Sequence, residues 1–195
     1  MAPLTALVLY WSAGGNTRRV AEALAQGLAS QGAAVTLLSM ADAATEEIDA
    51  EAYDLVCLGS PSYHFGVPAP VRRYVEQMGQ RGRALGLPQF GSPPRPHKWA
   101  VVFVTYGGPH TGLDEATPAG DYMAQALRHV GRQIRGAWYT VGAFHGDPDR
   151  EHNRLGWLGD IRGRPNEHDL GVIKSNARGL AYLLQHELDG GDGQG

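Results

Sequence analysis

Residues 10–17, YWSAGGNT, stand where an apolar run of strand length gives way to a segment of helical period. The run 4–11 is continuous, as in a buried strand, whereas Val20, Leu24 and Leu28 recur every fourth residue among alanines, as on one face of a helix. The two glycines between them permit positive φ angles and close backbone approach, and the N–H groups at a helix start point outward. The stretch therefore predicts a strand, a tight loop suited to an anion, and a helix.

This loop does not match two widespread phosphate-binding patterns. It lacks the lysine and the following hydroxyl residue of G-x-x-x-x-G-K-[ST], and it also lacks G-x-G-x-x-G, so neither a nucleoside triphosphate nor a dinucleotide is indicated. A plain turn with Asn16 or Thr17 as helix N-cap remains an alternative. Arg18 and Arg19 follow in the first helical turn, where cations oppose the helix dipole by about 0.3–1 kcal/mol each. Either a bound phosphate offsets that cost, or both side chains point into solvent.

The same alternation of strand and helix continues along the chain. Strands are predicted at residues 4–11, 35–38, 53–59, 99–106 and 136–143, and helices are predicted around residues 20–28, 68–78, 117–130 and 170–184. Residues 41–52 predict a short, weak helix or a loop, and the stretches 80–97 and 144–165 predict connections of loop character. Strands buried on both faces and alternating with helices imply a doubly wound parallel sheet. We expect one three-layer α/β domain over residues 1–188, with a five-stranded parallel sheet and a flexible tail over 189–195.

The composition narrows the class of protein. With 195 residues, of which 43% are hydrophobic and 19% charged, the chain can bury a core without metal or disulfide staples. A net charge of −3 without a basic cluster argues against nucleic-acid binding. The single cysteine, Cys57, excludes an internal disulfide, and the scattered histidines predict no metal site. The first apolar run has no basic leader and is too short to cross a membrane, so we expect a cytoplasmic protein without membrane insertion.

Two further loops are predicted to share an edge with YWSAGGNT. Ligands of doubly wound sheets bind beyond the carboxyl ends of the strands, where residues 59–70, GSPSYHFGVPAP, and 105–112, TYGGPHTG, are expected. The first offers three consecutive rings, and the second offers two glycines that let a ligand approach the backbone. The aromatic residues could equally pack back onto the domain. Together with the anion loop, these segments predict a site for a flat ring system with a phosphate tail.

These three loops resemble the FMN-binding loops of the flavodoxin-like proteins. The phosphate loop of that superfamily has approximately the pattern S/T-x-S/T-G-N-T, which residues 12–17, SAGGNT, match except at Gly14. GSPSYHFGVPAPVRRYVEQ resembles the second flavin loop with its helix, and TYGGP resembles the third loop. GRPNEHDLGVIKSNARGLAYLL resembles the last helix of the NAD(P)H:quinone oxidoreductase branch. The resemblance covers nearly the whole chain and implies the flavodoxin-like strand order 2-1-3-4-5.

The resemblance also implies which residues bind FMN. The phosphate would be held by Ser12, Gly14, Gly15, Asn16 and Thr17. The isoalloxazine would be flanked by Ser60, Pro61, Ser62, Tyr63, His64, Phe65 and Gly66. Its other edge would be lined by Thr105, Tyr106, Gly107 and Gly108. Because Gly14 stands where the pattern has a hydroxyl residue, phosphate binding is expected to depend more on backbone amides and to be weaker.

Other functions of this fold have weaker support in the sequence. A response-regulator receiver needs an acidic pair after the first strand and an aspartate after the third, and neither is present. The G-x-S-x-G elbow of a hydrolase is also absent. His110 and His145 are weak candidates for a catalytic role, because they lie in loops expected near the cofactor.

The resemblance leaves open what the flavin does. One hypothesis is an FMN-dependent oxidoreductase that takes electrons from NAD(P)H and reduces a quinone-like or other small acceptor. The alternatives are a flavodoxin-type electron carrier between protein partners and a flavin-binding module without turnover. Such carriers tend to be short and strongly acidic, whereas this chain has a net charge of only −3 and extra loops that could wall a substrate pocket. The reductase is therefore favoured, and its branch of the superfamily implies a homodimer or homotetramer.

Overall fold

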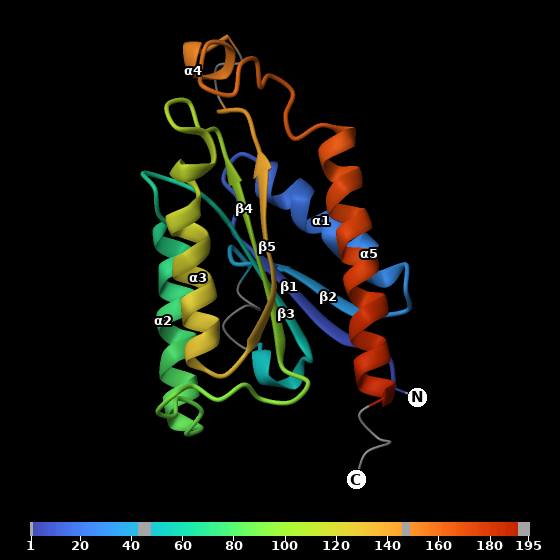
Figure 1. Ribbon diagram of the computed structural model, residues 1–195. Coiled ribbons are helices and arrows are strands. Elements are labelled where there is room, and N and C mark those ends of the chain that lie inside the picture. The colour runs from blue at the N-terminus through green and yellow to red at the C-terminus, as the bar shows by residue number, and fades with distance from the viewer. Residues whose placement is uncertain (1, 43–47, 146–148, 191–195) are drawn as a thin grey trace.

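Five parallel strands form one sheet in the computed structural model, which describes residues 2–42, 48–145 and 149–190 (Figure 1). The strand order β2-β1-β3-β4-β5 confirms the doubly wound α/β fold and its flavodoxin-like order. The strands are β1 (Thr5–Tyr10), β2 (Ala34–Ser39), β3 (Leu55–Pro61), β4 (Trp99–Tyr106) and β5 (Gln133–Val141).

Two long helices cover each face of the sheet and give the predicted three layers. One face carries α1 (Asn16–Ala29) and α5 (Glu167–Gly190), and the other carries α2 (Ala69–Ala84) and α3 (Thr117–His129). The short elements are η2 (Ala50–Ala52), η3 (Gly112–Glu115) and α4 (Glu151–Arg154). None of the helices in the described part of the chain has the length and apolar character needed to span a membrane.

The core is divided by the sheet, which explains why the central strands are apolar throughout. On β1, Ala6 and Val8 pack with α1 and α5, whereas Leu7 and Leu9 pack with α2 and α3. All four side chains are fully buried, because successive residues of a strand point to opposite faces. At Gly27 a Cβ atom would overlap the backbone of α5, so the close crossing of α1 and α5 requires glycine there.

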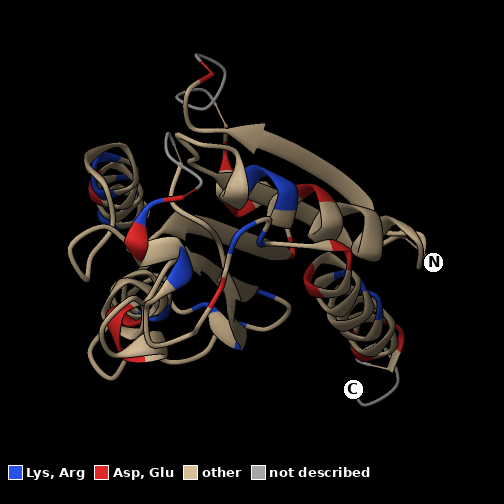
Figure 2. Cartoon of the chain, turned by 90° about the horizontal axis from the view of Figure 1, so that it is seen from above, with Lys and Arg blue, Asp and Glu red and all other residues tan. Residues whose placement is uncertain are grey.

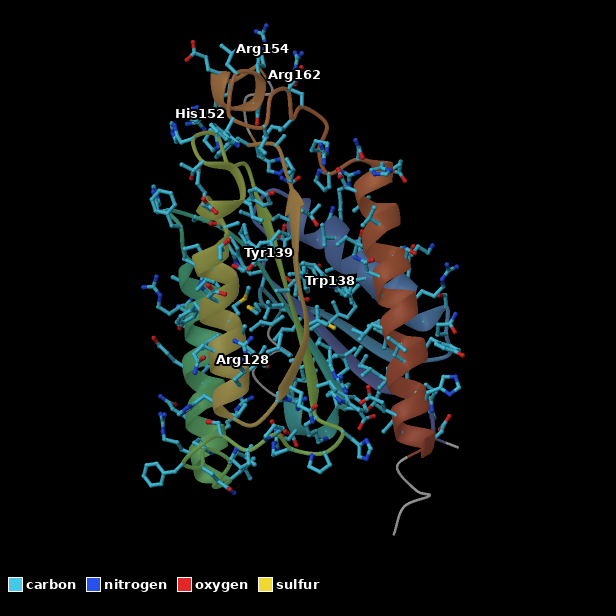
Figure 3. The ribbon with its side chains drawn as sticks, viewed as in Figure 1. Arg128, Trp138, Tyr139, His152, Arg154 and Arg162 are labelled. Atoms are coloured by element: carbon cyan, nitrogen blue, oxygen red, sulfur yellow. The ribbon has the colours of Figure 1, made fainter. Side chains whose placement is uncertain are left out.

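Several boundaries differ from those predicted. Strand β5 begins at Gln133, before the predicted start, because it is an edge strand whose polar residues interrupt the apolar pattern. In Figure 3 its Trp138 and Tyr139 point to opposite faces of the sheet. Helix α2 continues into the predicted 80–97 loop, and α4 lies within the predicted 144–165 connection.

Two of the sequence expectations fall partly outside the described residues. Helix α5 continues to Gly190 and so includes the first two residues of the predicted tail, while residues 191–195 are not described. Of the weak helix predicted over 41–52, only η2 forms within the described residues, and 43–47 are not described.

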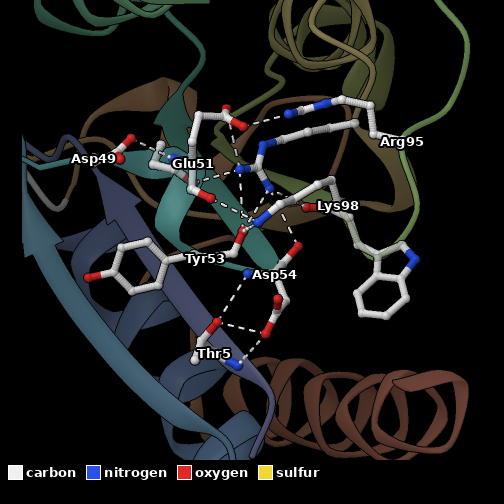
Figure 4. A network of polar contacts seen from close by, with 10 residues as sticks. Thr5, Asp49, Glu51, Tyr53, Asp54, Arg95 and Lys98 are labelled. Atoms are coloured by element: carbon white, nitrogen blue, oxygen red, sulfur yellow. Dashed lines mark hydrogen bonds and ion pairs between the residues drawn. The ribbon is translucent and has the colours of Figure 1, made fainter. Parts of the chain in front are cut away.

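A network of charges closes the amino edge of the sheet, opposite the predicted site (Figure 4). Glu51 accepts a hydrogen bond from Arg95 at 2.7 Å, and its backbone carbonyl accepts one from the Lys98 ammonium at 2.8 Å. The carboxylate of Asp54 accepts hydrogen bonds from both the N–H and the hydroxyl of Thr5. Arg132, whose side chain is 1% exposed, lies 3.5 Å from Glu51. Its guanidinium donates to the backbone carbonyls of Ala50, Asp54 and Trp99. These contacts fix the starts of β1, β3 and β4, and they leave the carboxyl edge free for a ligand.

Candidate functional site

The three predicted loops meet at the carboxyl edge of the sheet, which Figure 2 views from above. They surround a cavity of about 340 Å³. The anion loop contributes Ser12, Ala13, Gly14, Asn16 and Thr17, and the aromatic loop contributes Pro61, Ser62 and Tyr63. The loop after β4 contributes Thr105, Tyr106 and Gly107. A fourth segment, which the resemblance did not include, contributes Gly142, Ala143, Phe144 and His145.

The start of α1 is open to an anion. Gly15, the N-cap, has a left-handed φ of 94° and no side chain with which to cap the helix. The first turn contains no acidic residue, and the Ser12 hydroxyl accepts only the Gly15 N–H, at 3.0 Å. The first N–H groups of a helix need acceptors from outside the helix, and its dipole favours negative charge there. The geometry is therefore that of a phosphate-binding helix start.

Asn16 and Thr17 line the cavity, but their side chains also join the loops to one another. The Asn16 amide donates to the carbonyl of Ala143 at 2.8 Å, and the Thr17 hydroxyl lies 2.8 Å from that of Thr105. Thr17 is 1% exposed and Thr105 is 3% exposed, so this hydroxyl pair is shielded from water. Both residues therefore position the backbone of the anion loop in addition to lining the cavity.

Arg18 and Arg19 lie beside the anion loop with carboxylate partners of their own. Arg18 lies 3.7 Å from Glu22, one turn further along α1, and both side chains are about half exposed. Arg19 lies 4.0 Å from the exposed Glu167. Both side chains are partly exposed, and each also lines a cavity beside the anion loop, Arg18 together with Gly14 and Arg19 together with His145.

The aromatic loop is a tight hairpin with an unusual backbone. Tyr63 and Gly66 exchange two backbone hydrogen bonds of 2.8 and 3.0 Å, and His64 and Phe65 between them have φ angles of 48° and 65°. Positive φ at both central positions defines a type I′ turn, in which Asn-Gly is preferred to bulky residues. Strained backbone of this kind is concentrated at functional sites. The turn leaves Tyr63 and Phe65 about half exposed, and the Tyr63 ring meets Trp11 edge-on at 5.9 Å.

The two serines of this loop serve its internal structure. The buried Ser60 hydroxyl donates to the carbonyl of Pro61 at 2.8 Å, and the Ser62 hydroxyl donates to the carbonyl of Glu115 at 2.6 Å. Ser62 and Pro61 still line the cavity, whereas Ser60 lies behind it. Of this set, His64 and Phe65 line a second cavity instead.

The loop after β4 needs its glycines for close approach. A Cβ atom at Gly107 would overlap the ring of Phe144, and one at Gly108 would lie 2.6 Å from the carbonyl oxygen of Gly112. Gly108 also has a positive φ of 52°. Burial raises the pKa of the neighbouring Tyr106, so its phenol keeps its proton at neutral pH and can donate a hydrogen bond.

The segment after β5, residues 142–145, was largely missed by the sequence analysis. Hydrogen bonds hold its backbone in place: Gly142 donates to Tyr106, Ala143 donates to Arg164, and Phe144 donates to the buried Asn153 side chain at 2.7 Å. Its two rings then pack on glycines of the other loops, Phe144 on Gly107 and His145 on Gly14. The sequence offered one signal, a long polar connection, and placed His145 near the cofactor without giving it a partner.

A second cavity of about 340 Å³ adjoins the first. Like the first, it is lined by residues of the loops after β3, β4 and β5. The ring centroids of Phe144 and His152 lie 5.6 Å apart, and the Arg150 guanidinium lies over the Phe144 ring, 5.6 Å from its centroid. His110 lies here too, 6.0 Å from His152. Figure 3 shows His152, a residue of α4, at the carboxyl edge. The two candidate histidines are therefore separated, with His145 at the first cavity and His110 at the second.

The parallel sheet with order 2-1-3-4-5 and an anion loop after its first strand define a flavodoxin-like α/β protein. The family model of the flavodoxin domain matches residues 7–85, which include the anion loop and the aromatic loop. This part of the chain is therefore similar to the flavodoxin domain, whose family implies FMN as the cofactor.

Two curated proteins and one solved structure illustrate the similarity. The chain is 31% identical over 116 residues, 59% of its own length and 59% of the other's, to FMN-dependent NADH:quinone oxidoreductase 1 of Jannaschia sp. (strain CCS1). It is 25% identical over 103 residues to FMN-dependent NADH:quinone oxidoreductase of Marinomonas sp. (strain MWYL1), covering 52% of this chain and 51% of that protein. The chain thus spans little more than half the length of either relative. A flavodoxin from the domain Archaea superposes on 94% of this chain and 100% of its own, with a TM-score of 0.62 and 19% identity, which shows the shared fold.

Proposed function

We propose that this protein binds FMN in the first cavity and passes electrons from NAD(P)H through FMN to a small acceptor such as a quinone. The observation that carries the proposal is the pair of adjoining cavities at the carboxyl edge, one beside an open helix start and one lined by an arginine, histidines and aromatic side chains. The names of the two curated relatives support the donor and the acceptor class.

The residues of the first cavity fit FMN. The uncapped start of α1 suits a phosphate, and the volume of about 340 Å³ lies in the usual range for ligand sites. Trp11, Tyr63 and Tyr106 supply ring surface beside it. Gly107 lets the backbone of the third loop approach a flat ligand. Phosphate and ring system would thus both find their contacts in one cavity.

Bound FMN would accept hydride and release electrons singly or in pairs. The chain's own residues would hold it, shield one side of it from water with Phe144, and present the protonated Tyr106 phenol as a donor. In the second cavity, Arg150 would attract a ligand with acidic groups, as NAD(P)H has, while the Glu115 carboxylate that also lines it already accepts the N–H groups of His110 and Thr111. Separate places for cofactor and second ligand are what a reductase requires.

An electron carrier remains the second candidate, because large apolar side chains are exposed around the same edge. Tyr63, Phe65, Leu155 and Trp157 are 46%, 59%, 76% and 75% exposed, and a protein partner could cover them. A redox titration of the FMN-loaded protein separates the two functions. Two well-separated one-electron steps favour the carrier, and a single two-electron step favours the reductase.

The first experiment is an FMN titration followed by flavin fluorescence, using two matched variants. Gly15→Ala and Gly32→Ala both add a Cβ at a left-handed position with open space around it, at opposite ends of α1. Each should lower the free energy of unfolding by about 1–2 kcal/mol. Only Gly15→Ala should also weaken FMN binding. If phosphate binding loses the same ~1–2 kcal/mol, the dissociation constant should rise about tenfold.

The second experiment measures turnover. The FMN-loaded protein should oxidise NADH or NADPH with a benzoquinone faster than the same concentration of free FMN. A rate equal to that of free FMN would exclude the reductase while leaving the FMN site intact. Absence of FMN affinity in the wild-type protein would overturn the whole proposal.

A further inference from the structure

The anion loop departs from the flavodoxin-like pattern at Gly14, and a side chain from elsewhere takes the space that this glycine leaves. A Cβ atom at position 14 would overlap the imidazole ring of His145 and would lie 2.5 Å from its Nε2 atom. The imidazole therefore occupies the space in which a side chain at position 14 would begin. A ring nitrogen that can donate thus lies beside the position whose hydroxyl donor the pattern has lost.

His145 is held at this place by its own segment. The backbone on its amino side is fixed by two hydrogen bonds between Phe144 and the Asn153 side chain, 2.7 and 3.1 Å long. The Asn16 amide fastens the same segment to the anion loop through the carbonyl of Ala143. The imidazole is thus carried by a framework that includes the anion loop itself.

The surroundings of the His145 ring favour an anion. Its nitrogens make no hydrogen bond or ion pair with the described residues, and the ring borders both the first cavity and a neighbouring one. No carboxylate lines either cavity among those residues, whereas Arg19, Arg162 and Arg164 line the neighbouring cavity. Arg19, Arg162 and Arg164 each have a carboxylate partner, whereas the imidazole nitrogens have none among the described residues.

We propose that His145 replaces the missing hydroxyl of residue 14 and donates a hydrogen bond from its imidazole to the phosphate of FMN. Gly14 and His145 then form an exchanged pair, because glycine at 14 makes room for the ring and the ring supplies the donor that glycine lacks. This inference rests on the proposed binding of FMN. It differs from the expectation that phosphate binding at Gly14 depends more on backbone amides and is weaker.

The test compares the affinity of the protein for FMN and for riboflavin, which has the same ring system without the phosphate. Both dissociation constants are measured by fluorescence titration for the wild type, His145→Ala and the control His129→Ala, an exposed histidine in the last turn of α3. A hydrogen bond to a charged group corresponds to a loss of about ten- to a hundredfold in affinity. His145→Ala should lose that factor for FMN and leave riboflavin binding unchanged, and His129→Ala should change neither.

An exchange variant tests the pairing of Gly14 with His145 directly. Gly14→Ser should weaken FMN binding, because its side chain displaces the ring. The double variant Gly14→Ser/His145→Ala, which restores the hydroxyl and removes the ring, should recover most of the wild-type affinity for FMN. A double variant weaker than both single variants would contradict the exchange.

The remaining outcomes also test the role of His145 in FMN binding. Equal losses for FMN and riboflavin in His145→Ala would show that the ring only supports the loop, and unchanged affinity for both would show that it makes no contact. Either result would overturn the role of His145 while FMN binding by the wild type still stands. A wild-type protein that binds neither flavin would instead overturn the proposed function.

Discussion

The hydroxyl pair of Thr17 and Thr105 gives a prediction that can be calculated from the structure. The two oxygens lie 2.8 Å apart, and the residues are 1% and 3% exposed, so neither hydroxyl can turn to bulk water. Thr17→Val or Thr105→Val alone leaves one buried hydroxyl without its partner, which costs about 1–3 kcal/mol. The double variant removes both polar groups and keeps the shape, so its cost should be near zero. The expected coupling is therefore about 2 kcal/mol or more, well above the ~0.5 kcal/mol of independent sites.

Urea denaturation of the apo protein, followed by circular dichroism, measures this coupling. Each single variant should also lower the melting temperature by about 2–4 °C per kcal/mol, as is typical of a chain of this length. Losses that simply add in the double variant would refute the buried pair. They would indicate that the Thr17 hydroxyl faces the cavity, as the resemblance to the phosphate loop implied.

Three further predictions concern other parts of the molecule. Arg132→Met should lower the free energy of unfolding, measured by thermal denaturation, by about 3–5 kcal/mol, because Glu51 and the Ala50 carbonyl lose a buried partner. The control Arg128→Ala, at an exposed residue, should change it by less than about 0.5 kcal/mol. Burial raises the pKa of Tyr74 to about 12, above the ordinary value near 10, so this tyrosine ionises at lower pH in the unfolded chain than in the folded one. The free energy of unfolding should therefore fall as the pH rises from about 10 to 12. Urea midpoints should show a smaller fall for Tyr74→Phe. Asn153→Ala should release the Phe144–His145 segment and weaken FMN more than riboflavin in fluorescence titrations, and equal weakening would contradict this.

The fold was predictable because its signals are local. The apolar runs of β1, β3 and β4 are continuous, since each strand is buried on both faces. Strand β5 was placed less well, because it lies at the sheet edge and its start combines polar and apolar residues. The loops after the first, third and fourth strands also followed from local composition, and three segments of that kind were correctly expected at one edge of the sheet.

The details of the site were not predictable, because they depend on contacts between distant segments. The Asn16 amide meets the carbonyl of Ala143, 127 positions away, and Thr17 meets Thr105, 88 positions away. Nothing in SAGGNT indicates that these side chains are partly engaged with other loops. For the same reason, Gly14 suggested a lost donor, when the structure shows that the glycine makes room for His145.

The two long connections of the chain, 80–97 and 144–165, lie at opposite edges of the sheet, and only the second lines the candidate site. The 80–97 stretch is fastened at the amino edge, where the Arg95 N–H donates to the carbonyl of Gly131 and the Arg95 carbonyl accepts from the Gln133 side-chain amide, and none of its residues lines either cavity. The 144–165 connection lies at the carboxyl edge, where Trp157 donates to the carbonyl of Pro109 and Phe144 borders both cavities. It therefore supplies one wall of the second cavity as well as the ring beside the anion loop. A connection that lines both cavities supports the proposed reductase more than a carrier. Only a reductase must hold a second small molecule next to its cofactor.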